Sequence, residues 1–289
     1  MEDKKNDSRS VIMMVLSVLI FGTIGIFRRY IPLSSVFLAF ARGMIGGSFL
    51  LSVLRLRKNG SREKLRRRDL ILLILSGILI GINWMLLFEA YRYTTVAVAT
   101  LCYYMQPTIV ILASPFILGE KLTVRKAVCA AVAIAGMVLV SGVTGNGGHT
   151  GSMRGVFFGL GAAVFYASVI LLNKSVSGVD TILKTTVQLL SAGAVMIPYI
   201  LAAGGLTEEK FTPLTVALTL VVGIVHTGIA YVLYFGSMDG LKAQSVAILS
   251  YIDPVSALLF SALLLREPVS AAGVIGAVMI IGSALISEL

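Results

Sequence analysis

Residues 104–120 read YMQPTIVILASPFILGE, and residues 251–267 read YIDPVSALLFSALLLRE. Aligned at an offset of 147 residues, the two stretches share six identities in 17 positions, among them a proline and the final glutamate. Apolar composition alone would not readily place a proline and a glutamate at one common offset. The pair therefore indicates an internal repeat. Each copy carries a polar side chain directly before its proline, Gln106 in the first and Asp253 in the second.

The composition around these stretches is that of a membrane protein. The chain has 289 residues, of which 57% are hydrophobic and 13% are charged, whereas a soluble domain has about 25% charged residues. The charges are clustered, and the apolar runs between the clusters are about 20 residues long, enough to cross the hydrocarbon core as helices. We therefore predict an all-α integral membrane protein with ten transmembrane helices. The predicted spans are residues 11–27, 33–54, 70–90, 96–118, 124–143, 155–172, 182–202, 214–236, 244–265 and 271–286.

The repeat divides these spans into two halves of five, residues 1–145 and residues 146–289. An odd number of spans in each half makes the second half enter the membrane from the opposite side. The two halves are then inverted repeats, an arrangement typical of secondary transporters, with the substrate site near the midplane between the halves.

The distribution of basic residues predicts the orientation. With the N-terminus inside, 17 of the 24 lysines and arginines fall on the inner side, eight of them in residues 55–69. Cytoplasmic loops are enriched in lysine and arginine. We therefore expect both termini in the cytoplasm of a bacterial cell, with the chain in the inner (plasma) membrane. On this interpretation the net charge of +10 reflects topology, and nucleic acid is not an expected partner.

Residues 90–140 resemble a known family. They contain Ala90 followed by Tyr93-Thr94, a helix of small residues before Pro107, and the stretch GEKLT at residues 119–123. This pattern is similar to that of EamA-type transporters of the drug/metabolite transporter superfamily, which have ten spans in two five-span repeats. The resemblance covers nearly the whole chain, although Tyr91 stands where the family usually has leucine. It implies a transporter of small organic metabolites, such as amino acids or related amphipathic compounds, with export favoured over import.

Asp253 is the leading candidate for a functional residue. An aspartate at the centre of a membrane helix costs from about 2.5 kcal/mol upward, so it normally faces a cavity or a partner. Its repeat mate is Gln106 in the fourth span, which lies one helical turn from Tyr103. We expect these faces to meet across a central cavity, with Asp253 binding a cationic group or taking a proton. The alternative is a structural carboxylate hydrogen-bonded beside Pro254. The full set of predicted substrate-binding residues is Asp253, Gln106, Tyr103, Tyr104, Asn83, Trp84, His226 and Ser250.

Two further charges in the spans have two interpretations each. Arg42 lies well inside the second span and needs an anion, for which Asp253, Glu89 and a substrate carboxylate are the candidates. Glu89 precedes Arg92 by three residues, a spacing that permits an intrahelical salt bridge. Alternatively, Glu89 is a gate or a coupling carboxylate. Glu120 and Glu267 are expected to be structural, near helix N-termini begun by Thr123 and Ser270.

The sequence has no phosphate-binding loop, no paired histidines at metal spacing and no serine-nucleophile motif. We therefore expect no enzyme activity, cofactor or metal, and we keep an integral membrane enzyme or a channel as the alternatives. The expected partners are a small-molecule substrate and membrane lipid. Coupling to protons is left open, as is the choice between a monomer and a homodimer.

Overall fold

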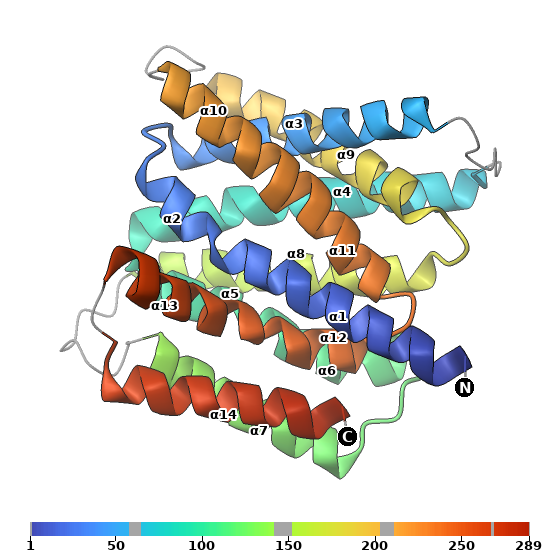
Figure 1. Ribbon diagram of the computed structural model, residues 1–289, viewed down its shortest axis with the longest axis vertical. Coiled ribbons are helices and arrows are strands. Elements are labelled where there is room, and N and C mark those ends of the chain that lie inside the picture. Colours follow the sequence, from blue (N-terminus) through green and yellow to red (C-terminus); the bar gives the residue numbers. More distant parts are fainter. Residues whose placement is uncertain (1, 58–64, 142–151, 203–210, 267–268, 289) are drawn as a thin grey trace.

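The computed structural model describes residues 2–57, 65–141, 152–202, 211–266 and 269–288. Helices account for nearly all of these residues (Figure 1). They are α1 (Glu2–Gly22), α2 (Ile24–Arg29), α3 (Ser35–Leu56), α4 (Arg67–Tyr93), α5 (Val96–Tyr103), α6 (Gln106–Ile117), α7 (Val124–Val140), α8 (Met153–Ser175), α9 (Thr181–Ala202), α10 (Pro213–Val221), the π-helix η1 (Val222–Ile229), α11 (Ala230–Ser237), α12 (Ala243–Ser250), α13 (Ile252–Leu265) and α14 (Ala271–Glu288).

The helices are those of a multi-pass membrane protein. Within the described residues, eight helices, counting broken ones as single units, are long and apolar enough to cross a membrane. The two remaining predicted spans form the shorter helices α7 and α14. Many leucines, isoleucines and phenylalanines on the outside of the bundle are exposed, Phe116 and Leu263 among them, as expected of side chains that face lipid.

Helix pairing in the bundle follows the two-fold pattern expected of paired repeats. The third span, α4, packs on the sixth span, α8. The equivalent spans in the repeat are the eighth and the first, and there α11 packs on α1. Likewise α4 packs on α9 of the seventh span, and the equivalent η1 of the eighth span packs on α3 of the second. The equivalent spans α3 and α9 contact each other, and so do α7 and α14. The two predicted five-span repeats thus contain helices that make matching contacts, and their division stays a prediction, with the boundary at residues 145 and 146 outside the described residues.

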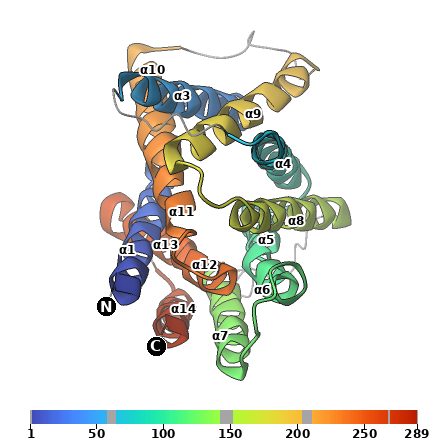
Figure 2. The same cartoon turned by 90° about the vertical axis from the view of Figure 1, so that its right-hand side faces the viewer.

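The last span of each half stands at one end of the molecule. Figures 1 and 2 show α7 and α14 together at the lower end of the long axis. A Cβ added to Gly136 would lie 2.7 Å from the Gly276 carbonyl oxygen, and one added to Gly276 would lie 2.4 Å from the Gly136 carbonyl oxygen. The two backbones touch at these glycines, which is how small residues bring membrane helices together.

Four of the predicted spans are not single α-helices. The first divides into α1 and α2 at Thr23, and the eighth contains η1. The fourth and ninth each divide two or three residues before a proline, at Tyr104-Met105 and at Tyr251. A proline has no N–H to give to the preceding turn, so the helix breaks before it. The two breaks thus lie at equivalent positions of the repeat and place the polar residues beside each proline.

Candidate functional site

Asp253 lies in the first turn of α13, directly after the break in the ninth span. The positive end of the helix dipole favours a carboxylate at this position. The Tyr104 hydroxyl donates a hydrogen bond to Asp253 Oδ2 at 2.8 Å. Tyr104 itself stands at the break of the fourth span. The carboxylate is partly buried. One phenol donates to it, and because a carboxylate has about four lone-pair sites, it keeps acceptor capacity for a further group.

The other break has a related arrangement. Tyr251, the repeat mate of Tyr104, shares a hydrogen bond of 2.9 Å with Thr108 Oγ1 on α6. Each break tyrosine therefore reaches across to the helix that follows the break in the other half. Gln106, the mate of Asp253, is buried, and its Oε1 has no hydrogen-bond partner within the described residues. The two halves are alike in their tyrosines and differ in the charge of the residue before proline.

A chain of aromatic rings extends from this pair into the bundle. Tyr103 lies with its ring centroid 5.6 Å from that of Tyr104 and 6.0 Å from that of Tyr166. Tyr166 lies 6.4 Å from Tyr234, and Phe21 lies 6.0 Å from Tyr234 and 5.2 Å from Tyr231, again between ring centroids. We call this set the ring chain; its members are Tyr103, Tyr104, Tyr166, Tyr234, Phe21, Tyr231 and Trp84.

Besides Tyr103 and Tyr104, two other predicted site residues lie at the ring chain, one as a neighbour and one as a member. Ser250, at the end of α12, lies 3.1 Å from the Tyr234 hydroxyl through its Oγ. Trp84 lies 6.4 Å from Tyr231 between ring centroids. The structure thus brings Asp253, Tyr103, Tyr104, Ser250 and Trp84 into one continuous set of contacts.

Arg42 stands at the far end of the ring chain. Its Cζ lies over the ring of Trp84, 4.2 Å from the centroid, a cation–π geometry. The predicted ion pair of Arg42 with Asp253 or Glu89 is not formed. Asp253 bonds to Tyr104, and Glu89 forms a salt bridge with Arg92 at 2.9 Å and accepts a hydrogen bond from the Tyr199 hydroxyl. The i,i+3 salt bridge permitted by the spacing of Glu89 and Arg92 is therefore present.

Asn83 and His226 lie outside the ring chain. Asn83 is buried and donates to the Ala162 carbonyl oxygen at 2.6 Å, so it joins α4 to α8 and does not line a surface with Trp84. His226 Nε2 lies 2.9 Å from Thr23 Oγ1, and the imidazole packs on Phe27 at 4.7 Å between ring centroids. His226 thus connects the η1 segment to the break between α1 and α2.

Sequence reasoning missed Tyr166 and Phe21 as members of the ring chain and Thr23 as a partner of His226. Tyr166 carried a usable signal, because a phenol near the middle of an apolar span needs a polar environment. Phe21 carried none, since a phenylalanine in a membrane helix is expected on any face.

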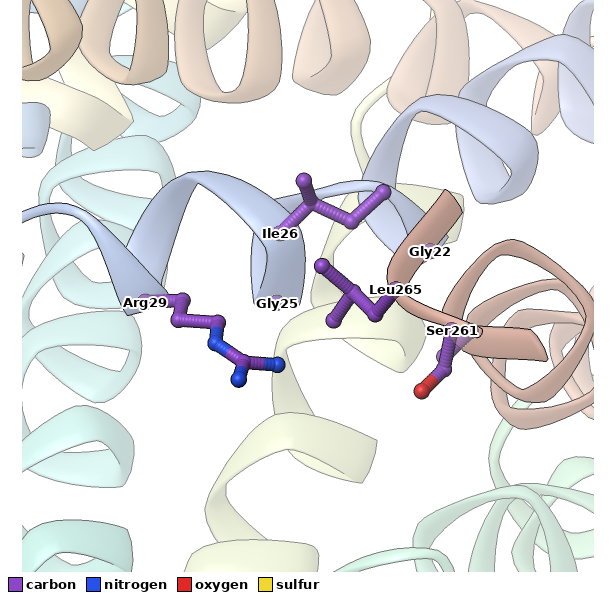
Figure 3. A pocket seen from close by; sticks show the side chains of 7 residues that line it. Gly22, Gly25, Ile26, Arg29, Ser261 and Leu265 are labelled. Carbon is purple, nitrogen blue, oxygen red and sulfur yellow. The ribbon is translucent and has the colours of Figure 1, made fainter. Parts of the chain in front are cut away.

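A pocket of about 480 Å³ lies beyond the Asp253 region, between α1–α2 and α13. Its α13 wall is Ala257, Ser261 and Leu265, which follow Asp253 at successive i+4 steps and so share its helix face. The opposite wall is Gly22, Gly25, Ile26 and Arg29 (Figure 3). Gly22, on this wall of the pocket, packs so closely on Ser256 that an added Cβ would overlap Ser256 Oγ.

The opposite end of the bundle, where both termini lie in Figure 1, is held by polar contacts. The Lys174 ammonium donates to the carbonyl oxygens of Met238 and Leu241 at 2.6 and 2.7 Å. The fully buried Lys184 lies 3.5 Å from Asp239 Oδ1. Glu120 accepts from the Ala243 and Gln244 amides at 2.7 and 3.2 Å, so it caps α12 in the other half. Thr123 and Ser270 cap α7 and α14 as predicted, and Glu267 lies outside the described residues.

The sequence matches the EamA-like transporter family over residues 8–142 and over residues 153–288. The chain belongs to this family. Among the relatives of this EamA-like chain, the uncharacterized transporter YxxF of Bacillus subtilis is 31% identical over 257 residues, which cover 88% of this chain and 81% of YxxF. An uncharacterized transporter of Archaeoglobus fulgidus is 27% identical over 277 residues, 95% of this chain and 94% of that protein.

Protein PecM of Dickeya dadantii is 29% identical over 226 residues, 75% of this EamA-like chain and 73% of PecM. A solved crystal structure matches the fold with a TM-score of 0.83 at 21% identity, covering 97% of this chain and 98% of the other. Family, relatives and fold agree with the apolar helices: the protein is a multi-pass membrane transporter.

Proposed function

We propose that this transporter moves small organic metabolites, such as amino acids or related amphipathic compounds, across the bacterial inner membrane by alternating access, in the export direction. The observation that carries this proposal is Asp253: an intramembrane carboxylate at a helix break, with one phenol partner and the ring chain beside it. Charged groups within membrane spans mark substrate or ion pathways. Broken helices at the midplane are a common way to build such sites in secondary transporters.

The two ends of the bundle support alternating access. Polar contacts of Lys174, Lys184 and Glu120 hold the end where the termini lie, whereas the pocket between α2 and α13 lies toward the other end (Figure 1). The distribution of basic residues favours a cytoplasmic location for the end where the termini lie. On this proposal the structure is closed toward the cytoplasm, and the pocket is part of the path on the outer side.

The contents of the site favour transport over the other two functions. The groups around Asp253 are phenols and hydroxyls, and the paired nucleophile and base of an acyl-transfer enzyme are not among the described neighbours. Gly22 of α1 packs closely on Ser256, three residues after Asp253 in α13. A close helix contact beside the carboxylate favours a transporter with gated access over an open channel.

Counterflow in proteoliposomes tests the proposal. Purified full-length protein is reconstituted, and uptake of labelled amino acids and amines is measured against an internal pool of the same compound. We expect saturable counterflow for at least one compound, reduced more than tenfold by Asp253→Asn. Asp69→Asn, at the N-terminus of α4, removes a carboxylate far from the ring chain and serves as the matched control.

Absence of counterflow across the panel, or turnover of a lipid by the reconstituted protein, would contradict the transporter mechanism. Unsaturable flux of many solutes would favour the channel. Wild-type counterflow in Asp253→Asn would assign the carboxylate a structural role.

A further inference from the structure

The guanidinium of Arg42 is a membrane-embedded cation without a carboxylate partner among the described residues. Its Nε is buried and donates no hydrogen bond to the described residues, and its Cζ lies over the face of Trp84, 4.2 Å from the ring centroid. A cation–π contact compensates part of the desolvation of a cation, by about 0.5–2 kcal/mol. An arginine inside a membrane span costs at least about 2.5 kcal/mol. The contact with Trp84 therefore compensates only part of the free-energy cost of burying the arginine, and a bound anion would compensate the rest.

The protein's own anions in this region have other partners. Glu89 is engaged by Arg92 and Tyr199, and Asp253 by Tyr104. Four titratable groups on neighbouring helices interact electrostatically with the Arg42 charge. They are Tyr91 of α4, Tyr103 of α5, His226 of η1 and Tyr231 of α11. Phenols are neutral at neutral pH, and His226 adds no negative charge. The anion that satisfies Arg42 is therefore external to the described protein.

Arg42 and Asp253 act on the same set of rings from opposite ends. Both charges are close enough to influence the hydroxyls of Tyr103 and Tyr231. The ring chain connects them without interruption, from Trp84 under Arg42 to Tyr104 on Asp253. The region thus has a cation at one end, a carboxylate at the other, and aromatic surfaces between.

We propose that Arg42, lying on Trp84, binds a carboxylate of the transported solute while Asp253 binds an ammonium group at the solute's other end. This proposal rests on the proposed function and names residues that would select its substrate. Arginine suits the role because its planar fork pairs with both oxygens of a carboxylate. The rings between the two charges suit a flat apolar body, through stacking and edge contacts.

Three probes with one aromatic skeleton separate the two ends. 4-(Aminomethyl)phenylacetate, a zwitterion, carries its two charges at opposite ends of one ring; 4-methylbenzylamine lacks the carboxylate, and 4-methylphenylacetate lacks the ammonium. Affinities are measured by isothermal titration on full-length protein in lipid nanodiscs. We expect wild type to bind the zwitterionic probe at least tenfold more tightly than either other probe.

The variants should shift this preference in opposite directions. Arg42→Gln is expected to weaken binding of the zwitterionic probe at least tenfold and leave 4-methylbenzylamine binding within twofold. Asp253→Asn is expected to spare 4-methylphenylacetate and weaken 4-methylbenzylamine. Arg42→Lys, which keeps a cation without the planar fork, should lose less than Arg42→Gln. Arg55→Gln, on the exposed end of the same helix, is the matched control.

Retained 4-methylbenzylamine binding shows that Arg42→Gln is folded, so a selective loss of affinity for the zwitterionic probe is interpretable. Unchanged affinity for the zwitterionic probe in Arg42→Gln would overturn the proposal. So would a wild-type protein that prefers 4-methylbenzylamine, or one that binds none of the three probes. Counterflow of any other solute would then still uphold the transporter, so failure of this inference is distinguishable from failure of the proposed function.

Discussion

The hydrogen bond from Tyr104 to Asp253 joins the two halves at their most polar point. A carboxylate in a low-dielectric setting gains more from one donor than it would in water, and it loses correspondingly more when that donor is removed. The phenol also fixes which carboxylate oxygen remains open, because Oδ2 is occupied and Oδ1 is not bonded to it. Tyr104 is therefore a positioning residue for Asp253.

At this scale we predict that Tyr104→Phe reduces transport five- to twentyfold and lowers stability by about 1–3 kcal/mol, since a charged acceptor loses its donor. Counterflow rate and thermal unfolding in detergent measure the two effects. Tyr93→Phe is the control, because Tyr93 stacks on Phe158 and its hydroxyl has no bond among those found in the described residues. Equal behaviour of the two variants would remove the positioning role.

Arg42 shows where single-residue reasoning from sequence fails. The need of an intramembrane arginine for an anion was predictable from its type and depth. The choice among Asp253, Glu89 and a solute was not, because it depends on how three helices are rotated about their axes. The same holds for Asn83 and Trp84, neighbours in sequence that face α8 and α11 respectively.

Among the elements, α1 packs on α13, the helix that carries Asp253. Ser256 Oγ lies 3.1 Å from the Val18 carbonyl oxygen, and Gly22 packs on the same serine. One turn further along, Gly25 faces open space, where an added Cβ would meet nothing within 4 Å. The two glycines lie on one wall of the pocket but are subject to opposite constraints.

We predict that Gly22→Ala destabilises the protein by about 1–3 kcal/mol through overpacking against Ser256. Gly25→Ala should be neutral or stabilising by up to about 1 kcal/mol, because alanine is the better helix former and has room. Thermal unfolding of both variants in the same detergent makes the comparison. An equal loss of unfolding free energy in Gly25→Ala would contradict the open space beside Gly25.

The breaks in the elements were only partly predictable. Pro107 and Pro254 indicated where the fourth and ninth spans would be loosened, and the structure divides both spans just before them. The π-helical turns of η1 and the division at Thr23 have no proline of their own. Both irregularities lie where α1, α2 and α3 pack on η1. We therefore attribute them to tertiary packing and not to a local sequence signal.

For the whole molecule, the number and positions of the apolar helices followed from sequence because a helix must be long and apolar to cross lipid, whatever its neighbours. What did not follow was the inter-half partner of Glu120, which caps α12 and not the helix that it precedes.

The proposed orientation predicts which residues a membrane-impermeant thiol reagent reaches in intact cells. In a background with Cys102→Ala and Cys129→Ala, Ser152→Cys should be labelled and Ser8→Cys should be protected. Both serines are exposed and precede or begin spans on opposite sides of the predicted membrane. Labelling of Ser8→Cys with protection of Ser152→Cys would reverse the orientation and with it the proposed direction of closure.

The Glu120 cap has a mechanical consequence. The carboxylate that begins α12 belongs to the segment between α6 and α7, and it holds two successive α12 amides. A tilt of α12, in the ninth span, is therefore transmitted through the Glu120 carboxylate to α6 of the fourth span. The segments α6 and α12 would then tilt in concert at the end near the termini. The hydrogen bonds of Tyr104 and Tyr251 across the breaks form a second connection between the two spans, deeper in the bundle.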